Sequence, residues 1–120
     1  MLELEKYKNI ILASGSPRRK ELMDLTGLKY QVIIPDVNEE ILPEETPKDH
    51  VERLALEKAI GVAANNPDDV VIGSDTVVIL NGRQILGKPR NKKDAKQMLA
   101  SLAGREHTVL SSVAAVWHRK

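Results

Sequence analysis

Residues 10–19 read IILASGSPRR, and the local structure that this stretch predicts organises the whole chain. It opens with a short apolar run, long enough for one buried strand. Ser16 and Pro17 then indicate the start of a helix, because serine caps a first turn and proline has no N–H to leave unpaired there. The stretch therefore predicts a strand, a turn of small residues, and a helix with Arg18 and Arg19 in its first turn.

The predicted turn is suited to an anion. Free N–H groups and the positive end of the helix dipole converge on it. Two arginines in the first helical turn are unfavourable unless a negative group lies between them. Two interpretations stay open, a phosphate site around Arg18 and Arg19 or a solvated basic helix start. The turn matches neither a Walker A motif nor a dinucleotide-binding fingerprint, so those mechanisms do not apply.

The composition bounds the class of protein. The chain has 120 residues, which is enough for one domain. The core must be aliphatic, because the sequence has no phenylalanine and only two tyrosines and one tryptophan. A net charge of +1 gives no general attraction to nucleic acid or to a membrane surface, and few aromatics argue against base stacking. Without cysteine there are no disulfides or thiolate metal sites. With no transmembrane-length apolar run and a charged N-terminus, we expect a soluble cytoplasmic protein.

The remaining pattern predicts an α/β fold. In the first helix we expect Leu22 and Leu25 to face inward and Gly27 to end it. Asn81-Gly82 predicts a hairpin turn. The order is β-α-β-α-β-β-α-β, a mixed β-sheet flanked by helices. Beyond the first helix, the expected elements are a strand at 28–34, an acidic loop at 36–45, a helix at 47–64, strands at 70–80 and 83–86, a helix at 92–103 and a strand at 107–117.

Asp75 lies in the middle of the most apolar predicted strand. A carboxylate buried there is costly unless it is paired or binds a metal, so we favour a functional role. We expect Asp75→Asn to leave the protein folded and more stable, because the substitution removes an isolated buried charge. Gly73 nearby indicates a bulge or a close approach of another backbone.

Two lysines and the acidic loop admit more than one interpretation. Lys58 interrupts or borders the apolar face of its helix, either as a side chain that reaches out to solvent or as a cation directed into a cleft. Lys88 lies between glycine and proline just after a strand, where an exposed loop lysine is the plain interpretation. Most carboxylates of the acidic loop are expected to be solvated, although one of them could face the basic helix start.

Several motifs together resemble the Maf family, the so-called septum-formation inhibitors, which are nucleoside-triphosphate pyrophosphatases. They are LASGSPRR at 12–19, IGSDTVV at 72–78, LGKP at 86–89 and LAGREH at 102–107. The resemblance implies a fold like that of inosine triphosphatase. It also implies hydrolysis of a triphosphate to the monophosphate and pyrophosphate with Mg²⁺ or Mn²⁺, and a role in restraining septum formation.

The resemblance also implies roles for particular residues. Asp75 and Glu39 would bind the metal and act in catalysis, and we favour Asp75 as the residue that orients or deprotonates water. An arginine directly after Pro17 is similar to members that act on dTTP and UTP rather than on 7-methyl-GTP. The residues implied to bind phosphate or substrate are Ser14, Arg18, Arg19, Lys58 and Lys88.

The chain departs from the family in length. We expect residues 1–120 to form a single Maf-like domain that lacks the family's C-terminal part, with its Asp-Lys-Ala-Gly and Ile-Gln-Gly signatures. The strand at 107–117 is apolar on both faces, so we expect an uncovered patch, self-association as a homodimer or larger species, and weak catalysis. Two other functions stay open. One is a catalytically impaired nucleotide-binding module that regulates cell division, and the other is a plain α/β interaction domain.

Overall fold

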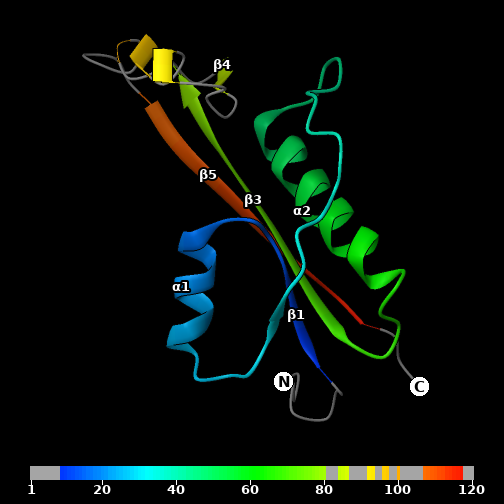
Figure 1. Ribbon diagram of the computed structural model, residues 1–120. Coiled ribbons are helices and arrows are strands. Elements are labelled where there is room, and N and C mark those ends of the chain that lie inside the picture. Colours follow the sequence, from blue (N-terminus) through cyan, green and yellow to red (C-terminus); the bar gives the residue numbers. More distant parts are fainter. Residues whose placement is uncertain are drawn as a thin grey trace.

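The computed structural model describes residues 9–80, 84–86, 92–93, 96–97, 100 and 107–117. The expected α/β order is confirmed for every strand and for the first two helices (Figure 1). The expected strand at 28–34 is shorter than predicted, and the expected helix at 92–103 is described only at five positions, all helical. The elements are β1 (Ile10–Ala13), α1 (Pro17–Leu25), β2 (Gln31–Val32), α2 (Pro47–Ala63), β3 (Val70–Leu80), β4 (Gln84–Leu86) and β5 (His107–Val116).

Strand β3 is the centre of a mixed five-stranded sheet. Strand β1 is parallel to both β2 and β3, and its register with β3 runs from Ile10↔Val70 to Ala13↔Gly73. Strands β4 and β5 are both antiparallel to β3. Strand β4 pairs with the last three residues of β3, and β5 pairs with residues 71–80. Because a strand has two edges and β5 takes one of them, β1 and β4 must share the other. Between β1 and β4, residues 74–77 of β3 have no strand partner on that edge in the described part of the chain, which leaves a gap in the sheet.

The core lies between the sheet and α2. Its main cluster joins side chains of β1, β3 and α2. At Gly73 the two backbones nearly touch, since a Cβ placed there would lie 2.3 Å from the carbonyl oxygen of Ala55 and 2.8 Å from the amide nitrogen of Ala59. The predicted close approach at Gly73 is therefore confirmed, and it brings the middle of α2 onto β3. The core cluster comprises Ile11, Ala13, Ala59, Val62, Ala63 and Val71.

The other face of the sheet is sparsely covered. Helix α1 lies on this side, away from α2 (Figure 1), and none of its side chains is buried in the structure as described. The prediction that Leu22 and Leu25 face inward is wrong for Leu25, whose side chain is 83% exposed. Leu22 lines a cavity over this face of the sheet with Leu12, although its side chain is 56% exposed. On β5, Val109 and Val113 are also exposed, as expected for an uncovered apolar strand, and self-association stays a prediction.

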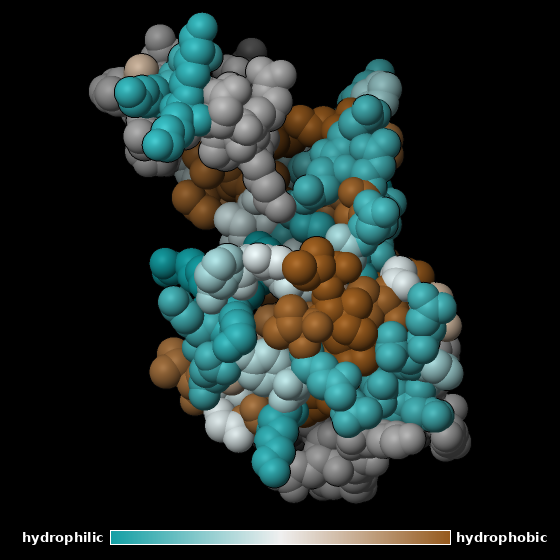
Figure 2. Space-filling view, in the orientation of Figure 1, coloured by the Kyte–Doolittle hydropathy of each residue, from teal (hydrophilic) through white to brown (hydrophobic). Residues whose placement is uncertain are grey.

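Hydrophobic side chains also gather at the centre of the surface shown in Figure 2, where the chain leaves β2. Ile34 in this segment is exposed. No helix in the described ranges is long and apolar enough to span a membrane.

Candidate functional site

The turn between β1 and α1 is organised by two serine hydroxyls. Ser14 Oγ accepts a hydrogen bond from the amide of Ser16 at 3.0 Å, and Ser16 Oγ accepts one from the amide of Arg19 at 3.4 Å. Ser16 is thus the predicted N-cap, and Pro17 occupies the first turn of α1. Ser14 is buried at the end of β1, beside the stretch of β3 that has no strand partner on this edge.

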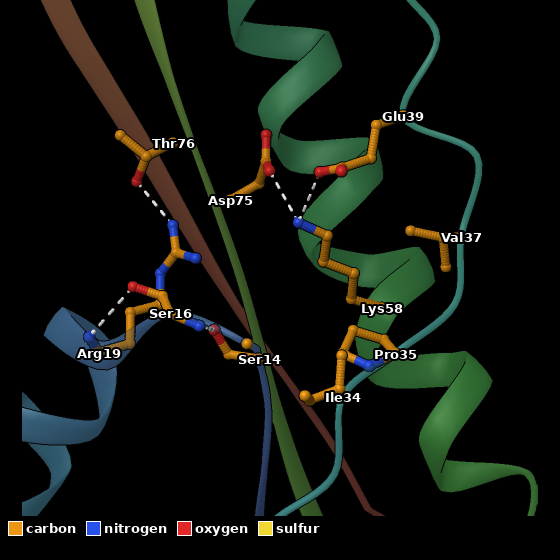
Figure 3. Close-up of a pocket in the computed structure, with 11 residues that line it drawn as sticks. Ser14, Ser16, Arg19, Ile34, Pro35, Val37, Glu39, Lys58, Asp75 and Thr76 are labelled. Carbon is orange, nitrogen blue, oxygen red and sulfur yellow. Dashed lines mark hydrogen bonds and ion pairs between the residues drawn. The ribbon is translucent and has the colours of Figure 1, made fainter. Parts of the chain in front are cut away.

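Three charged side chains meet on the α2 side of this gap (Figure 3). Lys58 Nζ lies 2.9 Å from Asp75 Oδ1 and 3.0 Å from Glu39 Oε1. Lys58 and Asp75 are buried, whereas the Glu39 side chain is 40% exposed. The interpretation of Lys58 as a lysine that reaches solvent is therefore wrong, and Asp75 is not an isolated charge. Close packing at Gly73 sets α2 near enough to β3 for this ion pair to form.

One carboxylate oxygen of Asp75 takes no part in the ion pair with Lys58. Oδ1 receives the hydrogen bond from Lys58, but Oδ2 is buried and has no hydrogen-bond partner among the described residues. A buried acceptor without a partner is costly, and such atoms call for an explanation such as a bound ion or water. Asp75 Oδ2 is therefore an oxygen available to a ligand.

A cavity of about 590 Å³ joins these groups to the turn after β1. It passes through the gap in the sheet, because Lys58 lines it from the α2 side and Arg19 from the α1 side. On the α1 side, Arg19 Nη2 donates to Thr76 Oγ1 at 2.7 Å (Figure 3). Thr76 Oγ1 also lies 2.7 Å from Ser111 Oγ. The cavity lining comprises Ser14, Gly15, Ser16, Arg19, Ile34, Pro35, Val37, Glu39, Lys58, Asp75 and Thr76.

The predicted site residues fall into three groups. Ser14, Arg19, Glu39, Lys58 and Asp75 line this one cavity. Arg18 does not line this cavity but a neighbouring one of about 560 Å³ on the α1 face of the sheet, and Arg19 lines both. Lys88 lies outside the described residues.

Sequence reasoning missed Thr76 and the apolar lining residues Ile34, Pro35 and Val37. The position of Thr76 directly after Asp75 was the one signal for the former. For the apolar segment we find no local signal, because only the fold brings it to the cavity.

A second charged cluster holds the acidic loop onto α2, and sequence reasoning missed this one too. Glu45 Oε2 accepts a hydrogen bond from Arg53 Nε at 2.6 Å, and Glu45 Oε1 lies 2.8 Å from His50 Nδ1. The hydrogen bond from Arg53, followed by those from His50 and the amide of Leu42, lowers the pKa of Glu45 from 4.5 to about 2, although burial acts in the opposite direction. The expectation that the acidic loop is solvated is therefore wrong for Glu45.

This cluster predicts a specific loss of stability in acid. Because the pKa of Glu45 is lower in the folded protein, its charged form stabilises the fold above pH 4.5, and that contribution is lost as the pH falls towards 2. We expect urea unfolding of the wild type to show decreasing stability across this range, and Glu45→Gln to remove part of the decrease. Glu52→Gln is the control, since the pair that Glu52 forms with Lys48 at 3.7 Å is exposed to solvent. Equal pH slopes in the wild type and Glu45→Gln would contradict the prediction.

Comparison with known proteins identifies the family. The family model described as Maf-like protein matches residues 9–120. The chain is 49% identical over 114 residues to a dTTP/UTP pyrophosphatase of Bacillus cereus (strain ATCC 10987 / NRS 248), an alignment that covers 95% of this chain and 56% of the relative.

Two further relatives carry the same description. The dTTP/UTP pyrophosphatase of Bacillus anthracis is 50% identical over 109 residues, covering 91% of this chain and 56% of the relative. That of Clostridioides difficile (strain 630) is 49% identical over 108 residues, covering 90% and 55%. The chain thus spans a little over half the length of these curated relatives. The match of the family model along nearly the whole chain shows that this protein belongs to the Maf-like proteins.

Proposed function

We propose that this chain carries the phosphate- and metal-binding part of a nucleoside-triphosphate pyrophosphatase that acts on dTTP and UTP. The reaction adds water across the bond between the α- and β-phosphates and releases the monophosphate and pyrophosphate. The observation that carries the proposal is the cavity in which Arg19, Lys58 and Asp75 come together. The descriptions of relatives about half identical to this chain support the substrates.

The cationic groups would bind the triphosphate. Phosphoryl transfer needs positioning and neutralisation of charge more than covalent chemistry. Arg19 supplies a planar donor at the N-terminus of α1, which suits a phosphate oxygen, and Lys58 supplies a point charge. Lys88 joins this set on the family resemblance alone. Ser14 contributes by holding the amide of Ser16 in the turn.

The carboxylates fit a divalent cation such as Mg²⁺ or Mn²⁺. Hard cations of this kind take one or two carboxylates together with substrate phosphates and waters. Asp75 offers its Oδ2, which has no partner among the described residues, and Glu39 lines the same cavity. When bound, the cation would neutralise phosphate charge and make water more acidic.

Asp75 is our candidate for the group that activates water. Its carboxylate is buried and held by Lys58, so it keeps one orientation. In the proposed step Asp75 accepts a proton from the water that attacks the α-phosphorus, while the bond to the β-phosphate oxygen breaks and pyrophosphate leaves with that electron pair.

The test is a comparison of two neighbouring arginines. We expect Arg19→Ala to weaken dTTP and UTP binding by about 1.5–3 kcal/mol, the range for hydrogen bonds to a charged group. Arg18→Ala should weaken binding less, because Arg18 lies in the neighbouring cavity. Isothermal titration calorimetry with Mg²⁺ measures both affinities. Lys20→Ala is the matched control, since it removes an equal charge from an exposed pair on the same helix. Unchanged affinity in Arg19→Ala would refute the phosphate site.

The alternative function that the sequence leaves open is a nucleotide-binding module that regulates cell division. Pyrophosphate release from dTTP separates the two functions. Turnover supports the enzyme, whereas binding without turnover supports the module.

A further inference from the structure

The loop that carries Glu39 is irregular, so something other than a strand or helix must hold it. One fixed point is a tight turn at residues 42–45, where the amide of Glu45 donates to the carbonyl of Leu42 at 3.1 Å. Pro43 precedes Glu44, whose φ is +63°, and these are the features of a type II turn. A side chain other than glycine at this φ is strained, and it persists only where the surrounding structure holds it.

The carboxylate of Glu45 supplies that hold. It is buried, with its side chain 7% exposed. It accepts hydrogen bonds from the amide of Leu42 at 3.2 Å and from Arg53 at both oxygens, Nε to Oε2 at 2.6 Å and Nη2 to Oε1 at 3.0 Å. A bidentate bond of this kind fixes direction as well as distance, and a lysine cannot reproduce it.

Arg53 also reaches the backbone beside Glu39. Its Nη2 donates to the carbonyl oxygen of Glu40 at 2.8 Å, while Nη1 is braced by Glu57 one turn further along α2 at 3.1 Å and 3.3 Å. Lys58, on the same helix, binds the side chain of Glu39. Helix α2 therefore grips two consecutive loop residues, one by its backbone and the other by its carboxylate.

We propose that Arg53 is a positioning residue that fixes the backbone at Glu40 and thereby places the carboxylate of Glu39 against Lys58. Its consequence for nucleotide and metal binding rests on the proposed function. Glu39 needs such a hold because its side chain is 40% exposed and its backbone lies in a loop. Arg53 itself does not line the cavity in the described structure, so it would act only through the loop.

The first test measures the loop without any ligand. Arg53→Lys keeps the positive charge but cannot form the bidentate hydrogen bond to Glu45. We expect this substitution to raise the hydrogen-exchange rates of the Glu40 and Leu42 amides by about tenfold or more, the effect of losing a hydrogen bond to a charged group. Amides of β3 should be unaffected. Glu57→Ala is the matched control, because it removes the acceptor of Arg53 Nη1 and leaves the bonds to Glu45 and Glu40 in place. Equal loop exchange in Arg53→Lys and the wild type would overturn the proposal.

The second test asks whether Arg53 acts through Glu39. Calorimetry with dTTP and Mg²⁺ is applied to Arg53→Lys, Glu39→Gln and the double variant. We expect both single variants to bind dTTP more weakly than the wild type. The double variant should bind no more weakly than Glu39→Gln, because without the Glu39 carboxylate Arg53 has no group to position. Losses that multiply in the double variant would overturn the proposal. A wild type that binds no dTTP would refute the proposed function instead, and the exchange comparison would still decide whether Arg53 orders the loop.

Discussion

Replacing Asp75 with asparagine is expected to reduce metal-dependent pyrophosphate release from dTTP by about 10²–10⁴-fold, the contribution typical of a positioned acid or base. The substitution keeps the shape of the side chain but removes the charge and one of the two carboxylate oxygens. The oxygen Oδ2, buried and unpartnered in the described structure, is the one that we assign to water or metal. The measurement is a pyrophosphate-release assay with Mg²⁺ or Mn²⁺, on the chain and on the variant at equal concentration.

The stability of the same variant separates function from folding. An isolated buried carboxylate would make Asp75→Asn more stable, but Lys58 lies 2.9 Å from Oδ1, so the substitution weakens an ion pair. Because asparagine still offers an acceptor oxygen, we expect a loss of about 1–3 kcal/mol in urea unfolding, and a folded protein. Glu39→Gln is the control at the more exposed partner of Lys58. Full turnover in Asp75→Asn would place the catalytic group elsewhere.

Gly73→Ala is expected to destabilise the fold more than Asp75→Asn does. The new Cβ would lie 2.3 Å from the carbonyl oxygen of Ala55 and 2.8 Å from the amide nitrogen of Ala59, and both are backbone atoms that a side-chain rotation cannot move. Helix α2 must therefore separate from β3, at a cost of about 3 kcal/mol or more. The separation also draws Lys58 away from Asp75, so we expect nucleotide binding to weaken as well.

Urea unfolding with Gly61→Ala as the matched control measures this effect. Gly61 lies in α2, but among the described residues no atom outside its own stretch of helix lies within 4 Å of the position its Cβ would take. Alanine is the better helix former, so Gly61→Ala should raise stability by about 0.5–1 kcal/mol. Similar effects at the two glycines would contradict the close contact of α2 with β3.

Local signals explain which elements could be predicted from the sequence. Ser16 and Pro17 mark the start of α1 by their own hydrogen-bonding chemistry, and the aliphatic run of β3 identifies a buried strand wherever it lies. Gly73 likewise indicated a close backbone approach, which the structure confirms. The structure also places five of the implied site residues around one cavity, and their roles stay predictions.

The features that sequence reasoning missed depend on partners far along the chain. Glu45 lies in a segment whose composition is typical of a solvated loop. Its side chain is nevertheless buried and charged, because Arg53 of α2 binds its carboxylate. Leu22 and Leu25 have helical spacing, but whether a side chain on α1 is buried depends on what packs over it. The position of Lys58 beside an apolar helix face is compatible with a side chain that points to solvent and with one that points into a cleft. The ion pair with Asp75 on β3 decides between the two.

The uncovered helix α1 has a consequence for local stability. With no buried side chain in the described structure, it is held by its serine cap and by contacts such as that of Tyr30 with the carbonyl of Lys20, so its opening costs little of the global unfolding free energy. Helix α2 and β3, in contrast, open only when the core does. The two sides of the cavity thus belong to different cooperative units. An anion bound by Arg19 and Lys58 together would couple those units, and part of its binding free energy would be spent on keeping α1 folded.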